Sequence, residues 1–211
     1  MADKTRPSKR QLEIQLGRLK ILEKPILKLE QYPVSSETAS ELLYMAGFEH
    51  NDLEGRVIDI GTGTGRLAIG AALMGAKEVV GVDVDEDALA LAKENAETAD
   101  VRIEWVQCEM DEVNGRFNAA IMNPPYGTRT SHADTRFLEK ALQLAPVVYS
   151  IHKSSTRGFL LQFMTKLGAD VDQVRSMTMT IPHLFEFHEK KRGTVQIDLY
   201  RIRRGSANTS A

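Results

Sequence analysis

Short apolar runs alternate along most of the chain with segments whose apolar residues recur at helical spacing. A short apolar run predicts a buried strand, and apolar residues three or four apart predict an amphipathic helix. The strands expected in this alternating part cover residues 56–60, 78–83, 103–107, 117–122 and 146–152. The helices expected after them cover residues 65–74, 86–98, 137–145 and 155–167.

The two ends of the chain depart from this alternation. Before the first strand we expect a helix over residues 9–23, an extended segment at 29–34, and a helix from Ser35 or Ser36 to Ala46. After the last helix, strand patterns near 173–181 and 194–203 flank a polar link at 188–193, which is typical of a hairpin.

Strands that alternate with helices build a mainly parallel sheet covered on both faces. The pattern therefore predicts an α/β, Rossmann-like fold with a seven-stranded, mostly parallel sheet and a C-terminal antiparallel hairpin. Such sheets bind ligands beyond the carboxyl ends of their strands. Residues with a chemical role should therefore follow the strands directly.

A length of 211 residues suits a single domain, with residues 9–50 as a helical lead-in. Residues 1–8 and 205–211 are small and polar, so we expect them to be disordered. One cysteine, Cys108, excludes an internal disulfide and a cysteine-rich metal site, and we expect no metal. The apolar runs are shorter than the roughly 20 residues that cross a bilayer. We therefore expect a cytoplasmic protein without membrane contact.

Charge is unevenly distributed, although the net charge is only −2. Lys and Arg gather in residues 1–20 and 190–204, whereas residues 78–112 are strongly acidic. Two interpretations stay open at this point. The basic ends form a surface that contacts the phosphates of a nucleic acid, or they are simply solvated.

A glycine-rich turn follows the first expected strand, at Gly61, Gly63 and Gly65. Glycines let the backbone turn tightly and let a ligand approach main-chain N–H groups. A dinucleotide fingerprint requires its third glycine one residue later, where this chain has Arg66. Asp83 ends the next strand, where a carboxylate can accept hydrogen bonds from two ribose hydroxyls.

This turn and acid resemble the cofactor site of class I methyltransferases. The resemblance implies S-adenosylmethionine as the cofactor and Asp83 as its ribose ligand. Glu109 would accept hydrogens from the adenine amine and Met110 would pack on the ring, unless this stretch is a plain surface loop. The other cofactor-binding residues expected around the turn are Asp59, Gly61, Gly63, Thr64 and Gly65.

The most specific motif is Asn123-Pro124-Pro125-Tyr126, which ends the fourth expected strand. The lone pair of an exocyclic amine on an aromatic ring is delocalised, so the amine is a poor nucleophile. Two acceptors aimed at its hydrogens, the Asn123 side-chain oxygen and the Pro124 carbonyl, would localise that lone pair. Consecutive prolines fix the backbone, and Tyr126 offers a ring on which a base can stack. A plain proline turn after a buried strand is the alternative interpretation.

Three stretches narrow the family: residues 23–33, 122–128 and 152–157. In order and spacing they resemble a methyltransferase-like family of archaea and eukaryotes that methylates one adenine at N6 in small-subunit ribosomal RNA. The similarity runs from about Arg10 to Ile202, and this chain is similar to the shorter archaeal members. The resemblance implies that the substrate is RNA.

The resemblance also implies roles outside the two motifs. Gln31 and Val34 close over the cofactor, and the family often has Thr where this chain has Val34. His152, Lys153 and Ser154 lie near the substrate mouth and contact the RNA phosphate or the flipped nucleotide. The alternative is that Ser154 or Ser155 merely caps the next helix.

Eukaryotic relatives work with a small zinc-binding activator subunit. If this chain has such a partner, the contact area would lie near Ile69, Leu73, Val79 and Val80, residues that suit a core equally well. Other functions remain open at this stage. They are methylation of guanine N2 or of a protein glutamine, a non-catalytic scaffold that binds cofactor or RNA, and a nicotinamide oxidoreductase.

Overall fold

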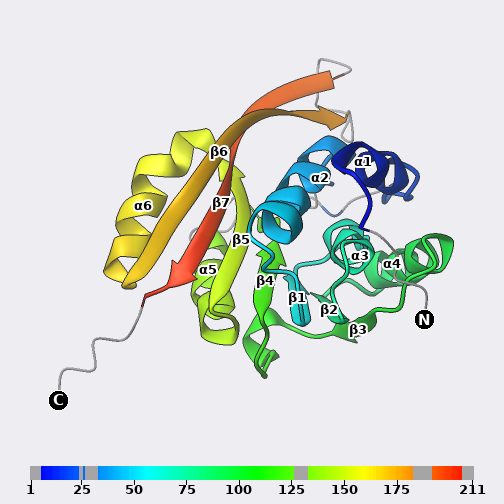
Figure 1. Ribbon diagram of the computed structural model, residues 1–211, viewed down its shortest axis with the longest axis horizontal. Coiled ribbons are helices and arrows are strands. Elements are labelled where there is room, and N and C mark those ends of the chain that lie inside the picture. Colours follow the sequence, from blue (N-terminus) through cyan, green and yellow to red (C-terminus); the bar gives the residue numbers. More distant parts are fainter. Residues whose placement is uncertain (1–5, 24–25, 27–32, 126–132, 183–191, 206–211) are drawn as a thin grey trace.

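The computed structural model describes residues 6–23, 26, 33–125, 133–182 and 192–205 (Figure 1). Within these ranges seven strands form one sheet in the order β3-β2-β1-β4-β5-β7-β6. Parallel pairing joins β1 (Arg56–Ile60), β2 (Glu78–Asp83), β3 (Glu104–Gln107), β4 (Ala119–Met122) and β5 (Val147–Lys153). The antiparallel members are β6 (Ala169–Pro182) and β7 (Arg192–Arg204), and β7 lies between β5 and β6. This sheet confirms the predicted fold.

Helices cover both faces of the sheet (Figure 1). One face carries α1 (Lys9–Gly17), α2 (Ser36–Tyr44), α3 (Arg66–Leu73) and α4 (Glu86–Thr98). The other carries α5 (Ala133–Leu144) and α6 (Arg157–Lys166). Three short turns complete the described elements: the π-turn η2 (Met45–Glu49) and the 3-10 turns η3 (Met110–Glu112) and η4 (Ser154–Thr156).

Most element boundaries agree with the sequence pattern, and the differences have local causes. The first helix ends at Gly17 rather than at residue 23, although Leu19 stays buried. Helix α5 begins at Ala133, four residues before the expected start, because its first turn is polar and carries no apolar periodicity. Both hairpin strands are longer than expected, since their alternating exposed positions hide the strand from an apolar count.

The expected disorder of residues 1–8 is wrong for the part that the structure describes. Ser8 caps α1 and forms a capping box with Gln11. The Arg6 guanidinium donates to the Gly47 carbonyl at 2.7 Å and to Asn51 Oδ1 at 2.8 Å. Residues 1–5 and 206–211 lie outside the described residues.

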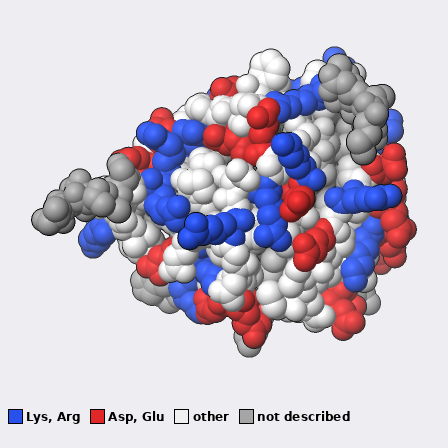
Figure 2. Space-filling model, turned by 60° about the horizontal axis from the view of Figure 1, so that its bottom comes forward, with Lys and Arg blue, Asp and Glu red and all other residues white. Residues whose placement is uncertain are grey.

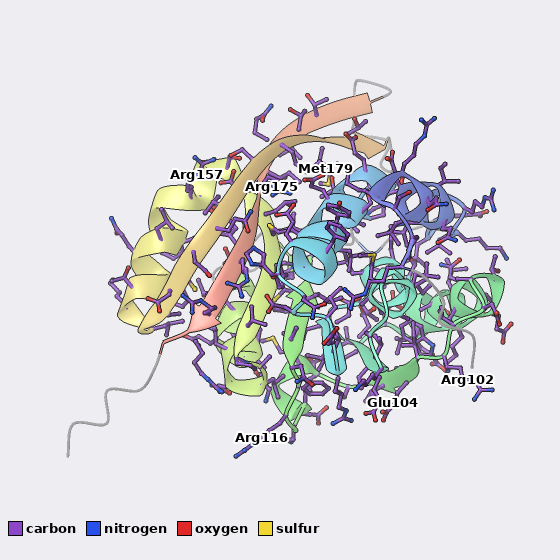
Figure 3. The ribbon with its side chains drawn as sticks, in the orientation of Figure 1. Arg102, Glu104, Arg116, Arg157, Arg175 and Met179 are labelled. Atoms are coloured by element: carbon purple, nitrogen blue, oxygen red, sulfur yellow. The ribbon has the colours of Figure 1, made fainter. Side chains whose placement is uncertain are left out.

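The N-terminal lead-in is fastened to the hairpin by charged side chains (Figure 3). Arg175 on β6 reaches Glu41 of α2 at 2.5 Å and Glu49 of η2 at 2.8 Å. Lys9 of α1 shares the Glu41 carboxylate. Elements far apart in the sequence are thereby held together, and the lead-in is fastened to β6 at the end of the sheet.

Helix α3 packs so closely on α1 and α2 that it has no room for a methyl group at Gly70. A Cβ there would lie 2.2 Å from Leu43 Cδ1 and 3.4 Å from Leu16 Cδ1, both in the core. We expect Gly70→Ala to lower the free energy of unfolding by about 1–3 kcal/mol. Gly158→Ala is the matched control, because it is also a helical glycine but meets nothing within 4 Å. Urea unfolding of both variants measures this, and equal losses would contradict the packing explanation.

Candidate functional site

The carboxyl ends of β1, β2 and β4 meet at one edge of the sheet. In the register of these strands, Ile60 lies beside Val82 and Asp59 lies beside Ile121. Gly61 follows the last residue of β1 and Asn123 follows the last residue of β4, and these two strands pair in parallel. The glycine turn and the Asn-Pro-Pro segment are therefore neighbours, as the positions of both motifs after their strands predict.

Left-handed backbone conformations shape the glycine turn. The φ angles are +72° at Gly61, +54° at Gly63 and +83° at Gly65, values that side chains other than glycine's rarely allow. The Gly63 N–H donates to Asp83 Oδ2 at 2.7 Å, which ties the turn to the end of β2. A Cβ built at Gly63 meets nothing within 4 Å, so the backbone there faces open space. A ligand can therefore approach the turn at Gly63.

The third glycine serves packing. A Cβ at Gly65 would lie 2.7 Å from the Trp105 ring and 3.1 Å from Ala92 Cβ. The same ring blocks Gly81, where a Cβ would lie 2.4 Å from Trp105. The indole on β3 thus fills the space that both glycines leave. The sequence did not lead us to predict this contact. The single tryptophan of the chain, on a strand next to the glycine-bearing elements, was the residue that could have indicated it.

Asp59 lies beneath the turn and is 1% exposed. Its Oδ2 atom accepts from Thr62 Oγ1 at 2.6 Å and from the Ala68 N–H at 3.0 Å. Its Oδ1 atom is buried without a hydrogen-bond partner. Burial raises the pKa of Asp59 to about 7, although those two hydrogen bonds act in the opposite direction. A buried acceptor is thus available next to the glycine turn.

The raised pKa of Asp59 makes the stability of the cofactor-free protein depend on pH. The folded chain keeps this proton to about pH 7, whereas the unfolded chain releases it near the ordinary value of 3.8. The contribution of Asp59 to stability is therefore full below about pH 4 and is lost as the pH rises towards 7. We expect Asp59→Asn to remove this fall, which is on the order of 4 kcal/mol. Denaturant unfolding at several pH values tests it, and parallel pH curves for the two proteins would contradict it.

Asp83 at the end of β2 and the loop after β3 lie at the same carboxyl-terminal end of the sheet. Burial raises the pKa of Asp83, while N–H donors from Asp85 and Gly63 act against that rise. Glu109 is exposed and forms a capping box with Glu112 at η3. Met110 is partly buried and packs against the core on the α5 side. The predicted contacts of Glu109 and Met110 with an adenine ring stay predictions.

A partly buried arginine and a buried asparagine attach the lead-in to the glycine turn. The Arg66 guanidinium donates to the Val34 carbonyl and, at 3.4 Å, to the Leu19 carbonyl. Asn95 on α4 donates to the Thr64 carbonyl at 2.9 Å and accepts from the Lys20 N–H, also at 2.9 Å. The sequence pattern did not lead us to predict a role for Asn95. An amide side chain at an apolar position of an amphipathic helix was the feature that could have indicated one. These bonds place Val34 and Thr64 at the same edge.

Asn123, Pro124 and Pro125, which we call the reactive segment after the role predicted for them, follow β4 directly. Pro124 is buried, and Asn123 and Pro125 are partly exposed. Tyr126, predicted to stack on the base, and Gln31, predicted to close over the cofactor, lie outside the described residues. Among the described residues, no group of three or more His, Cys, Asp or Glu could hold a metal ion.

The family is shown by comparison with known proteins. Residues 35–146, which hold both motifs, match the family model of the methyltransferase small domain. The chain belongs to this methyltransferase family. It is therefore an S-adenosylmethionine-dependent methyltransferase, as predicted. That the residues described above bind the cofactor stays a prediction.

Relatives of this methyltransferase match it over almost its whole length. The rRNA N(6)-adenosine-methyltransferase METTL5 of Danio rerio is 34% identical over 201 residues, which are 92% of this chain and 97% of the relative. The corresponding protein of Caenorhabditis elegans is 37% identical and covers 90% and 94%. The solved structure of a Pyrococcus horikoshii protein matches with a TM-score of 0.87 and 38% identity, covering 95% of this chain and 99% of that one.

The predicted substrate loop of the methyltransferase is partly a strand. His152 and Lys153 belong to β5, and the His152 ring is 2% exposed. Burial lowers the pKa of His152 to about 3, so the ring is neutral where it meets Ser150 Oγ at 2.6 Å. Ser154 donates to Asp198 at 2.8 Å, and the residue that caps α6 is Thr156. The helix-cap interpretation of Ser154 or Ser155 is therefore wrong, and RNA contact by this segment stays a prediction.

Proposed function

We propose that this methyltransferase transfers a methyl group to the N6 amine of an adenine in RNA, and that the RNA is small-subunit ribosomal RNA. The observation that supports the proposal is the parallel pairing of β1 and β4, because Gly61 follows the last residue of β1 and Asn123 follows the last residue of β4. An amine held by the Asn-Pro-Pro segment would thus lie beside the cofactor. Both motifs are otherwise far apart in the sequence.

The residue types at this segment suit an amine substrate. The Asn123 side-chain oxygen and the Pro124 carbonyl can accept the two hydrogens of the N6 amine, which leaves its lone pair free. Pro124 and Pro125 have no N–H to compete and hold the backbone fixed. The bound cofactor supplies a methyl group already activated by its sulfonium, so orientation rather than a strong base does most of the catalysis. A paired adenine must leave its helix to reach such a segment.

The residues at the edge fit S-adenosylmethionine. The unpaired Oδ1 of Asp59 and the open space at Gly63 suit the charged, amino-acid end of the cofactor. The carboxylate of Asp83 accepts from Gly63 and Asp85 and retains lone pairs for ribose hydroxyls. Val34, Thr64, Glu109 and Met110 complete the proposed set, together with Gln31.

The relatives support RNA and adenine as the target. Two eukaryotic relatives carry the name rRNA N(6)-adenosine-methyltransferase and match at least nine tenths of this chain. The Pyrococcus horikoshii protein is described as a candidate RNA methyltransferase. A protein substrate is the second candidate, because the Asn-Pro-Pro-Tyr motif also acts on glutamine amides in enzymes that resemble this one.

Surface charge alone does not argue for RNA. Many basic side chains at the two ends are neutralised by ion pairs: Lys9 with Glu41, Lys20 with Glu94, and Arg201 and Arg203 with Asp172. Figure 2 shows Lys and Arg interspersed with Asp and Glu over the face it presents. These ion pairs weaken the interpretation that the basic ends form a surface for RNA phosphates. We propose that recognition of the base and of the RNA shape contributes more to RNA binding.

A small activator subunit remains part of the proposal, but the predicted contact area does not. Ile69, Val79 and Val80 are at most 5% exposed and belong to the two cores of the domain. Leu73 is partly buried and packs against one of these cores.

Among the described residues, no helix is long and apolar enough to span a membrane.

The test is a methylation assay with the purified chain. Labelled S-adenosylmethionine is incubated with isolated small-subunit RNA, large-subunit RNA and ribosomal protein, and the products are digested for mass spectrometry. We expect N6-methyladenosine from small-subunit RNA. N2-methylguanosine, methylglutamine or transfer to the other fractions would overturn the corresponding part of the proposal. Addition of cell extract shows whether an activator raises the rate.

A further inference from the structure

A buried carboxylate lies where β5, β6 and β7 run side by side. Asp198 on β7 pairs with His152 of β5 on one side and with Ser176 of β6 on the other. Its side chain is fully buried. It interrupts a run of apolar core residues, because Ile197 and Leu199 on either side of it are buried as well. Burying a charge is costly unless it is paired, so the partners of Asp198 explain its presence.

The Asp198 carboxylate accepts hydrogen bonds from side chains at both ends of η4. Arg157, which follows η4, donates from Nε to Oδ2 at 2.7 Å and from Nη2 to Oδ1 at 2.6 Å. Ser154, which begins η4, donates to Oδ1 at 2.8 Å, and Ser176 donates to the same atom at 2.9 Å. Two parallel bonds between a guanidinium and a carboxylate fix angle as well as distance. We call Asp198, Arg157 and Ser154 the Asp198 clamp.

The clamp acts next to the reactive segment. Strands β4 and β5 pair in parallel as far as Met122 beside Ser150, and β5 continues to Lys153 at the same carboxyl-terminal end. The turn that the clamp holds therefore begins on the strand next to β4, at the end where Asn123 follows β4. Figure 3 shows Arg157 at the start of α6, beside the hairpin.

The cofactor residues lie further away in the sheet. Strand β4 separates β5 from β1, and β2 lies beyond β1. The clamp also stands on the α5 and α6 face, where Tyr200 donates to Asp198 and packs in the second core. A change in the clamp should thus move the turn at Lys153 and Ser154 without moving the glycine turn.

We propose that Asp198 and Arg157 are positioning residues that hold Lys153 and Ser154 at the substrate side of the site for binding of RNA. The proposal rests on the proposed function, because it assumes that RNA enters beside Asn123. Stability alone is a poor explanation for the clamp, since a buried ion pair is often no more stabilising than well-packed apolar residues. A fixed turn geometry is what the paired charge adds.

The experiment compares Asp198→Asn with Asp172→Asn on the full chain. Asp172 is a matched control, because it lies on the same hairpin, pairs with Arg201 and Arg203, and sits at the end remote from the site. We expect Asp198→Asn to raise the KM for RNA about tenfold to a hundredfold, because small misplacements have such effects. Its kcat should change less, and its S-adenosylmethionine affinity should stay within about twofold of the unaltered protein. Asp172→Asn should leave all three values unchanged.

Variants of Arg157, the exposed partner of Asp198, test the proposal without replacing the buried carboxylate. Arg157→Lys keeps the charge but loses the paired hydrogen bonds, so its KM should lie between those of the unaltered protein and Arg157→Met. Hydrogen exchange should quicken at the amides of residues 154–157 in Asp198→Asn and not in Asp172→Asn. These Arg157 variants decide the question if Asp198→Asn fails to fold.

The outcomes separate the two proposals. An unaltered protein that methylates no RNA overturns the proposed function and the clamp proposal with it. An active protein whose clamp variants keep the normal KM for RNA overturns the clamp proposal alone. The same holds if cofactor affinity falls in parallel with RNA affinity, because the clamp would then act on the whole fold.

Discussion

Asn123→Ala should lower the rate of methyl transfer to RNA by about 100-fold to 1000-fold, which is the usual cost of losing one preorganised polar group in an active site. Asn123 follows the last residue of β4 and is partly exposed, so its removal leaves the sheet pairing of Ala119 to Met122 in place. Without the side-chain oxygen, one of two acceptors for the amine hydrogens is missing. The amine lone pair then stays delocalised into the ring.

The expected signature is a loss of kcat with cofactor affinity retained. Single-turnover transfer from labelled S-adenosylmethionine measures the first, and calorimetry measures the second. Asn114→Ala serves as a control, because Asn114 is an exposed asparagine in the loop before β4 and bonds only to the Glu112 carbonyl in the described structure. Near-normal transfer by Asn123→Ala would refute its assigned role.

Gly63→Ala should reduce S-adenosylmethionine affinity by about tenfold or more, equal to at least about 1.4 kcal/mol. The φ of +54° at Gly63 strains any side chain, and the new methyl group would project into the open space that we assign to the cofactor. The strain alone costs about 1–2 kcal/mol of stability. The loss of affinity is the additional effect.

Gly168→Ala separates strain from ligand contact. Gly168 has a φ of +66° and also faces nothing within 4 Å, but it lies in the turn between α6 and β6. Both variants should lose similar stability in urea, and only Gly63→Ala should lose cofactor affinity. Equal affinities in the two variants would show that the cofactor does not approach Gly63.

The regular elements were predictable because each carries its own local pattern. Strand β2 and helix α4 begin and end where their apolar periodicity does. The two central motifs were predictable for the same reason, since a glycine turn and a double proline each impose a backbone geometry within a few residues. Their position after strands then placed them at one edge.

Contacts between distant segments carry no such local signal. The glycine spacing gave no sign that Gly65 and Gly81 also leave room for Trp105. The predicted contact area at Ile69, Val79 and Val80 is buried in the core. His152, predicted at the substrate, is buried against Ser150 and Tyr200.

The amino-acid sequence by itself determined the α/β class, the order of its elements, and the two motifs that we assign to the cofactor and the substrate amine. Backbone preferences and apolar periodicity act over a few neighbouring residues, so these features need no distant contact. Only the tertiary structure decided which polar side chains meet. Asp198 joins Arg157 across 41 residues, and Asn95 joins Lys20 across 75, and such pairings depend on how the strands and helices pack.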